Sequence, residues 1–185
     1  MLAAIQQCDL SILLWIQDHI RCPFLTPFFK TITHFADNGI GWIILTVLLL
    51  FFASTRKRGL SMVIALLTGI IITNLLLKNL VARIRPYDAY ETVKLLISPD
   101  PEYSFPSGHS CASFAAATAM FCGKKNRYGV LALILAALIA FSRLYVGIHY
   151  PTDVLCGTLI GIGCGIASVR LTALTHKACP GPISG

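Results

Sequence analysis

The stretch that decides the fold runs from residue 60 to residue 86 and reads LSMVIALLTGIIITNLLLKNLVARIRP. Its first part, residues 60–77, contains no Asp, Glu, Lys or Arg. A helix needs about 20 apolar residues to cross the hydrocarbon of a bilayer. The stretch therefore predicts a membrane-spanning helix with Lys78, Arg83 and Arg85 near one end. Ionisable residues beside lipid are costly, so we take them first as functional candidates.

The composition of the whole chain is that of a membrane protein. Of the 185 residues, 56% are hydrophobic and 12% are charged, whereas soluble domains carry about 25% charged residues. The net charge of +7 does not indicate nucleic-acid binding, because the basic residues gather in short loops between apolar runs. The seven cysteines form no Cys-x-x-Cys pair, so neither a disulfide framework nor a zinc site is expected.

Five apolar runs predict five spanning helices, and hence an all-α, multi-pass membrane helical bundle. They cover residues 39–53, 60–80, 107–122, 128–146 and 154–174. The N-terminal residues hold two shorter apolar pieces, which charged residues and prolines interrupt. One broken helix that adds a sixth span and two helices at the membrane surface both stay open. We expect three parts, namely an N-terminal segment (1–37), a membrane core (38–175) and a flexible C-terminal tail (176–185).

Basic loops indicate the orientation of this bundle. Positive charges cluster in three groups between or after the spans, namely Arg56-Lys57-Arg58, Lys124-Lys125 with Arg127, and Arg170 with Lys177. The positive-inside rule places these groups in the cytoplasm. Because successive spans alternate in direction, residues 81–106 and 147–153 are then expected on the extracytoplasmic side.

The last apolar run carries glycines at four-residue spacing, Gly157, Gly161 and Gly165. Small residues at this spacing let another helix approach closely. We expect that helix to belong to the same molecule rather than to a dimer partner, and the oligomeric state stays open.

The first of three polar stretches pairs a lysine with an arginine. Lys78 and Arg85 are seven residues apart, about two helical turns, so they should share nearly one helix face. Pro86 disfavours helical backbone at the residue before it, so we expect the helix to end at Arg85. Both cations suit phosphate oxygens. Taken alone, they are explained equally well by snorkelling toward lipid headgroups.

The second polar stretch, Pro106-Ser107-Gly108-His109, stands where the third span begins. Proline suits the first turn of a helix, and free N–H groups at a helix start bind anions. Gly108 lets a ligand come close to the backbone, and the Ser107 hydroxyl is a further donor. His109 would then face the bound anion. A capped helix with an incidental histidine is the alternative.

The third polar stretch contains Ser142-Arg143, His149 and Asp153. Pro151 indicates that the last span begins near residue 150, which leaves His149 in the loop and Asp153 in the first helical turn. A carboxylate four residues beyond a histidine can accept its Nδ1–H and leave Nε2 free as a nucleophile. The alternative is a helix-capping aspartate beside an unrelated histidine.

Together the three stretches resemble the signature of the type 2 phosphatidic acid phosphatase superfamily. That signature is Lys-x6-Arg-Pro, Pro-Ser-Gly-His and Ser-Arg-x5-His-x3-Asp. The chain matches it as KNLVARIRP from residue 78, PSGH from residue 106 and SRLYVGIHYPTD from residue 142. The match is complete at the polar positions and keeps their order. Residues before 78 carry no comparable motif.

The resemblance implies a role for each matched residue. His149 would be the nucleophile that forms a phosphohistidine, Asp153 would orient it, and His109 would be the general acid that protonates the leaving oxygen. The phosphoryl oxygens would be held by Lys78, Arg85, Arg143, Ser107 and the amide of Gly108. The fixed cations would take the place of a metal ion, so no metal or other cofactor is expected.

The ionisable residues Arg83 and His34 are not part of the signature. We interpret Arg83 as an ordinary interfacial arginine and His34 as an interfacial histidine. Neither is expected to contribute to the site.

The sequence thus predicts a metal-independent phosphatase of a lipid phosphate or pyrophosphate, embedded in the plasma membrane with its site on the extracytoplasmic side. Undecaprenyl pyrophosphate is the favoured substrate, and phosphatidylglycerol phosphate and phosphatidic acid are alternatives. The rivals from other classes are a vanadate-dependent haloperoxidase, whose known members in this superfamily are soluble, and a non-enzymatic transporter. A neutral nucleophilic histidine and a protonated acidic one predict a bell-shaped pH profile.

Overall fold

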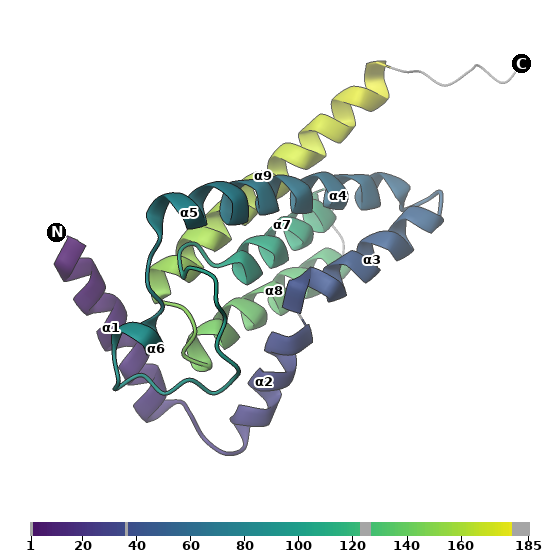
Figure 1. Ribbon diagram of the computed structural model, residues 1–185. Helices are drawn as coiled ribbons and strands as arrows, with labels where there is room; N and C mark the ends of the chain where they lie inside the picture. Colours follow the sequence, from purple (N-terminus) through teal and green to yellow (C-terminus); the bar gives the residue numbers. More distant parts are fainter. Residues whose placement is uncertain (1, 36, 123–126, 179–185) are drawn as a thin grey trace, which may run out of the picture.

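The computed structural model describes residues 2–35, 37–122 and 127–178. Within these ranges the chain is helical and has no strand, as predicted. The elements are α1 (Leu2–His19), α2 (Leu25–Phe35), the 3-10 turn η1 (Asp37–Gly39), α3 (Ile40–Phe51), α4 (Arg56–Ile70), the π-helical η2 (Ile71–Leu77), α5 (Lys78–Val81), α6 (Pro86–Ala89), α7 (Gly108–Cys122), α8 (Arg127–Tyr145) and α9 (Pro151–Ala178). Figure 1 shows α3, α4, α7, α8 and α9 as a bundle, with α1 and α2 against one end of it.

Helices occupy all five ranges in which spans were expected. Within the described ranges, three stretches are long and apolar enough to cross a membrane, namely Arg56–Ala89, Arg127–Tyr145 and Pro151–Thr175. Helix α3 is apolar but has 12 residues. Helix α7 has 15 residues and is the inner helix of the bundle, since most of its side chains are small and buried. Because α7 packs on other helices rather than on lipid, it needs less apolar character than its neighbours.

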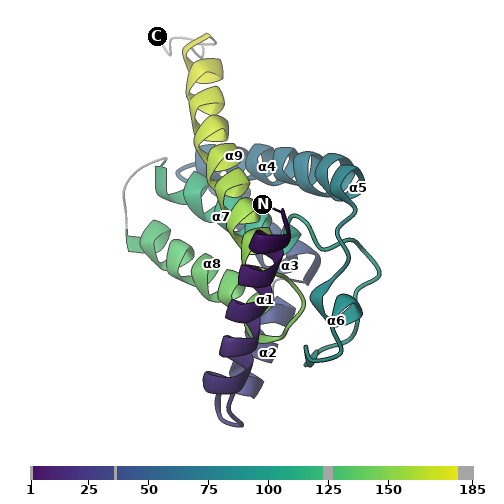
Figure 2. The ribbon, with the colours of Figure 1, turned by 90° about the vertical axis from the view of Figure 1, so that its left-hand side faces the viewer.

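The N-terminal segment forms two separate helices rather than one. Helix α1 contacts α8 and α9, and α2 packs on α8; Figure 2 shows α1 lying across the bundle end. Phe29 of α2 contacts the ring of Tyr145, with 4.5 Å between the centroids. At the other end of the chain, α9 continues to Ala178, into the segment expected to be a flexible tail. Residues 179–185 and the Lys124-Lys125 pair lie outside the described residues.

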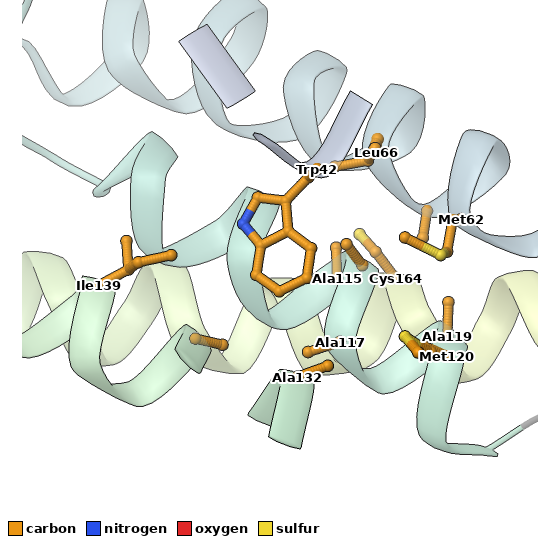
Figure 3. Packing of buried hydrophobic residues seen from close by; sticks show 13 residues of the cluster. Trp42, Met62, Leu66, Ala115, Ala117, Ala119, Met120, Ala132, Ile139 and Cys164 are labelled. Carbon is orange, nitrogen blue, oxygen red and sulfur yellow. The ribbon is translucent and has the colours of Figure 1, made fainter. Parts of the chain in front are cut away.

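The hydrophobic core is centred on Trp42 of α3, which is 1% exposed. Its indole Nε1 donates a hydrogen bond of 3.0 Å to Oγ of Ser113 in α7. Met62 and Leu66 from α4 and Ile139 from α8 surround the ring together with several alanines (Figure 3). These small side chains let the helices approach closely around one large aromatic ring.

Helices α7 and α9 pack almost backbone to backbone. A Cβ atom added to Gly161 would lie 2.4 Å from the carbonyl oxygen of Cys111, and one added to Gly157 would lie 2.4 Å from that of Ser107. A Cβ added to the third glycine of the row, Gly165, would lie 2.8 Å from the carbonyl oxygen of Ala115. The glycine row therefore serves packing within one molecule, which confirms the sequence prediction.

The end of the second predicted span differs from expectation. Ala82 has left-handed backbone angles (φ 48°, ψ 40°), and its N–H donates to the carbonyl of Lys78 at 2.9 Å. The helix thus ends before Arg85, which is extended (φ −71°, ψ 153°). The prediction that Lys78 and Arg85 share a helix face is therefore wrong. The left-handed residue turns the chain, and the extended backbone that follows carries Arg85 to the site instead.

Candidate active site

A cavity of about 510 Å³ lies at the end of the bundle that α1 and α2 cover. Five of the eight predicted site residues line it, namely Lys78, Gly108, His109, Arg143 and His149. The other three, Arg85, Ser107 and Asp153, are buried next to lining residues. The structure therefore brings together residues from three separate stretches of the sequence.

His149 lies in the short loop between α8 and α9, where the sequence placed it. Gly147 makes the turn possible with φ at 83°, and a Cβ there would lie 2.9 Å from the carbonyl oxygen of Lys94. Only glycine adopts this backbone without strain. Helix α9 then begins at Pro151, with Asp153 in its first turn, as predicted.

His149 and Asp153 face each other, with a serine between them. Nδ1 of His149 is 3.6 Å from Oδ2 of Asp153. Oγ of Ser104 lies 3.4 Å from that nitrogen and donates a hydrogen bond of 2.5 Å to the same carboxylate oxygen. The orienting contact is thus shared with Ser104, which the sequence interpretation did not include.

Asp153 is fully buried and is held by an arginine. Nη1 of Arg83 lies 2.6 Å from Oδ1 of Asp153, and Nη2 lies 2.7 Å from Asp9 of α1. The guanidinium also covers the ring of Tyr150, 3.8 Å from its centroid. The interpretation of Arg83 as an ordinary interfacial arginine is therefore wrong. Arg83 connects α1 to the carboxylate that faces His149.

The other end of the His149 ring faces Arg85. Nη1 of Arg85 lies 3.4 Å from Nε2 of His149 and donates to the carbonyl of Ile148 at 3.2 Å. The pKa of His149 is lowered to about 3, mainly by burial and also by the charges of Arg85 and Arg143, although the contact with Asp153 acts in the opposite direction. The ring is therefore neutral at ordinary pH, so a lone pair is available for attack.

Two of the cations are paired with carboxylates of one loop. Lys78 is ion-paired with Glu102, and Nη2 of Arg85 lies 2.7 Å from Oδ2 of Asp100. Burial raises the pKa of Asp100, but the backbone N–H of Glu102 and the charges of Arg85 and Lys78 outweigh it, and the net shift is downward. An acidic loop thus lies against the cations that are predicted to hold phosphate.

Arg143 is 2% exposed and lines the cavity. One of its terminal nitrogens donates to Oγ1 of Thr33 in α2. Its Nε–H is buried and has no hydrogen-bond partner among the described residues. Buried donors are rarely left unpaired, so an anion in the cavity would supply the missing acceptor.

Gly108 lines the cavity, whereas Ser107 is buried beside it. The N–H of Ser107 donates to the carbonyl of Asp153 at 3.0 Å, and its hydroxyl bonds to that of Ser110 at 3.0 Å. The N–H of Ser107 is therefore engaged, whereas its hydroxyl oxygen is, among the described residues, an acceptor from the O–H and the N–H of Ser110. Gly108 lines the cavity, and a Cβ there would lie 3.1 Å from Oδ1 of Asn74. The role of both residues in phosphate binding stays a prediction.

His109 faces a carboxylate that the sequence interpretation missed. Its Nε2 lies 3.1 Å from Oδ1 of Asp37, in η1, and the other oxygen of Asp37 lies 2.8 Å from Nδ1 of His34. The hydrogen bond from His109 lowers the pKa of Asp37 to about 2; burial opposes the shift, and His34 and Arg143 support it. His34 lines the cavity, which corrects its interpretation as an incidental interfacial histidine.

Known proteins resemble both the sequence and the structure. The family model of the PAP2 superfamily matches residues 58–176. An undecaprenyl-diphosphatase of Sulfolobus acidocaldarius is 35% identical over 130 residues, which cover 70% of this chain and 63% of that protein. The chain thus spans less than two thirds of the length of this relative.

Two solved structures have a similar fold. The crystal structure of Aquifex aeolicus LpxE superposes with a TM-score of 0.78 at 30% sequence identity, and the match covers 87% of this chain and 94% of that one. The crystal structure of a transmembrane PAP2-type phosphatidylglycerolphosphate phosphatase from Bacillus subtilis gives a TM-score of 0.73 at 25% identity, over 96% and 88% of the two chains.

Proposed function

Because the chain belongs to the PAP2 superfamily, we propose that it is a membrane lipid phosphatase that hydrolyses a phosphate or pyrophosphate ester of a lipid. The observation that carries this proposal is the cavity at the helix ends. It joins the buried cations Lys78 and Arg143 with both signature histidines, and Arg85 contacts one of those histidines. Phosphoryl transfer requires mainly positioning and charge stabilisation, and fixed cations supply both.

In the first chemical step Nε2 of His149 attacks phosphorus. The bond from phosphorus to the leaving oxygen breaks, and His109 donates its proton to that oxygen. Arg85 and Arg143 stabilise the charge on the equatorial oxygens. Asp153 holds the imidazole while it becomes positively charged.

In the second step water hydrolyses the phosphohistidine. His109, now neutral, accepts a proton from the attacking water, and the bond between phosphorus and Nε2 of His149 breaks. Inorganic phosphate leaves, and both histidines return to their starting protonation states.

The lipid portion of the substrate fits the apolar side of the cavity, which Ile43, Leu66, Ile70 and Ala112 line. We favour undecaprenyl pyrophosphate, on the basis of the Sulfolobus relative. Phosphatidylglycerol phosphate is the second candidate, because the B. subtilis structure is of a phosphatase for that lipid. Initial rates of phosphate release from these two lipids and from phosphatidic acid, measured in detergent, decide between them.

The mechanism is tested by His149→Ala, with His19→Ala as a matched control outside the cavity. Rapid quenching with substrate labelled at the reacting phosphorus should give an acid-labile, alkali-stable label on wild-type protein and none on His149→Ala. Phosphate release should disappear in His149→Ala and persist in the control. Full activity of His149→Ala would contradict the mechanism. Activity should also persist in EDTA, and loss that magnesium restores would indicate another class of phosphatase.

The proposed site faces the extracytoplasmic side of the membrane. The support is the distribution of basic loops, since Arg56-Lys57-Arg58 begins α4 at the end opposite the site. Epitope tags inserted after Ser54 and after Asp88 test this orientation. Antibody should reach only the second tag in intact spheroplasts, and labelling of the first tag alone would reverse the orientation.

The two rival functions have separate tests. Peroxide-dependent bromination in the presence of vanadate would support a haloperoxidase. Lipid flux into liposomes without phosphate release would support a transporter. The cations Lys78, Arg85 and Arg143 gather at one end of the bundle rather than along its length, which favours the phosphatase.

A further inference from the structure

The second histidine of the site has a carboxylate partner of its own. Oδ1 of Asp37 lies 3.1 Å from Nε2 of His109. Among the described residues Nδ1 of His109 has no hydrogen-bond partner, although the side chain lines the cavity. If Nε2 is occupied by Asp37, then Nδ1 is the nitrogen left to exchange a proton with a ligand.

Asp37 also contacts a second histidine. Its second oxygen lies 2.8 Å from Nδ1 of His34, so the two histidines share the carboxylate with one oxygen each. Asp37 begins η1, which directly precedes α3 and ends at Gly39 with φ at 69°. The turn that joins the N-terminal helices to the bundle therefore places this carboxylate at the cavity.

The other charged groups around the cavity show why His109 requires the carboxylate of Asp37. The titratable and charged groups that line the cavity with His109 are His34, Asp37, Lys78, Asp100, Glu102, Arg143 and His149. Lys78 and Arg143 oppose a positive charge on His109. The carboxylates of Asp100 and Glu102 are already paired with Arg85 and Lys78. Asp37 is the carboxylate in direct contact with His109, so it offsets this repulsion.

We propose that Asp37 is a positioning residue for His109: it holds the ring by Nε2, turns Nδ1 toward the leaving oxygen, and stabilises the protonated ring before the proton is transferred. The proposal rests on the proposed phosphatase function. It gives the site two histidine–carboxylate pairs, one for the nucleophile and one for the acid. The proton moves from Nδ1 to the leaving oxygen, and Nδ1 later accepts a proton from water.

The test is the dependence of kcat/KM on pH for wild type, Asp37→Asn and Asp37→Glu, with Asp88→Asn as control. Asp88 is an exposed carboxylate of α6 and does not line the cavity. In Asp37→Asn the alkaline limb should move to lower pH by about one unit or more, because the protonated ring loses its counter-charge. kcat should fall about 10- to 100-fold, within the usual contribution of an acid–base group, while KM changes little. Asp37→Glu should restore part of both effects.

Two further measurements separate this inference from the proposed function. Inhibition by inorganic phosphate and the thermal midpoint in detergent report on an intact site and fold, and both should be close to wild type in Asp37→Asn. An unshifted alkaline limb, or loss of folded protein in both Asp37 variants, would overturn the positioning role. Activity in His149→Ala would instead overturn the phosphatase mechanism. The pH dependence of the Asp37 variants would still decide whether Asp37 acts on His109.

Discussion

Arg83 donates a hydrogen bond of 2.6 Å to Oδ1 of Asp153, although it belongs to none of the three motifs. The same guanidinium pairs with Asp9, which is 1% exposed. Two buried carboxylates without this cation would repel each other and would lack compensation for their desolvation. Arg83 thereby links the N-terminal helix α1 to the carboxylate that faces His149.

Replacement of Arg83 by Gln should lower kcat and leave KM nearly unchanged, because Arg83 contacts Asp153 but does not line the cavity. Hydrogen bonds to charged groups contribute about 1.5–3 kcal/mol, which corresponds to about 10- to 100-fold in rate. Steady-state kinetics in detergent measure the effect, with Arg58→Gln at the distant end of α4 as control. An unchanged kcat would contradict this role. Because Asp9 contacts Arg83 as well as Thr152, the effects of Asp9→Asn and Arg83→Gln should be less than additive.

Neutralising the acidic loop should strengthen the binding of inorganic phosphate. Asp100 and Glu102 pair with cations that are proposed to hold phosphate, so they compete with the anion. These carboxylates are partly exposed, and such pairs contribute at most about 1 kcal/mol. Asp100→Asn should therefore lower the inhibition constant of phosphate by up to about fivefold. Asp88→Asn is the control, and a raised constant in Asp100→Asn would exclude competition.

Buried His149 makes the folded state sensitive to acid. Its pKa is lowered from 6.5 to about 3 by burial, so between these values the unfolded chain binds a proton that the folded protein does not. Stability should therefore fall as the pH drops from about 6.5 toward 3, by up to about 1.4 kcal/mol per pH unit. Thermal midpoints in detergent at pH 7 and pH 5 measure this loss. The difference between the two midpoints should be smaller in His149→Gln. An equal difference in that variant would mean that other groups cause the loss of stability.

The same shift modifies the expected pH profile of activity. A neutral His149 persists well below pH 6.5, so the free enzyme should not lose its nucleophile across the neutral range. The acid limb that the sequence predicted should lie near the low end of the pH scale, whereas the alkaline limb belongs to His109. A loss of kcat/KM with a midpoint near 6.5 that His149 variants remove would contradict this assignment.

The packing of α9 on α7 gives a matched pair of glycine substitutions. A Cβ at residue 161 would lie 2.4 Å from a backbone oxygen, whereas one at residue 163 would meet nothing within 4 Å. Gly161→Ala should destabilise the protein by about 1–3 kcal/mol through overpacking. Gly163→Ala should be neutral or slightly stabilising, because alanine favours helix. Thermal unfolding in detergent compares them, and equal midpoints would show that the seam tolerates a methyl group.

The sequence predicted those parts of the fold that depend on local pattern. Apolar runs located the helices because the bilayer requires them, and the spacing from His149 to Asp153 predicted a facing pair because one loop and one helical turn determine it. The glycine row of α9 likewise indicated close packing within the molecule. The prediction that Lys78 and Arg85 share a helix face was wrong because the helix ends at Val81. The next residue, Ala82, has left-handed backbone angles although it is not a glycine, so the sequence does not signal this turn.

The contacts between distant segments could not be predicted. Asp9, Asp37 and Ser104 reach the site from α1, from η1 and from the loop before α7, and their partners lie far away in the sequence. For Asp9 a signal was present, since an acidic residue beside an apolar run is costly unless it has a partner. For Asp37 and Ser104 the sequence carries no comparable signal, because polar residues are ordinary in connecting segments.

The backbone contact between α7 and α9 also begins at the site, where the N–H of Ser107 donates to the carbonyl of Asp153. His109 and Asp153 each stand in the first turn of one of these helices. Main-chain atoms, rather than flexible side chains, thus set the spacing between the two halves of the chemistry. Substitutions on helix faces that point away from this contact should therefore leave the spacing between His109 and Asp153 unchanged.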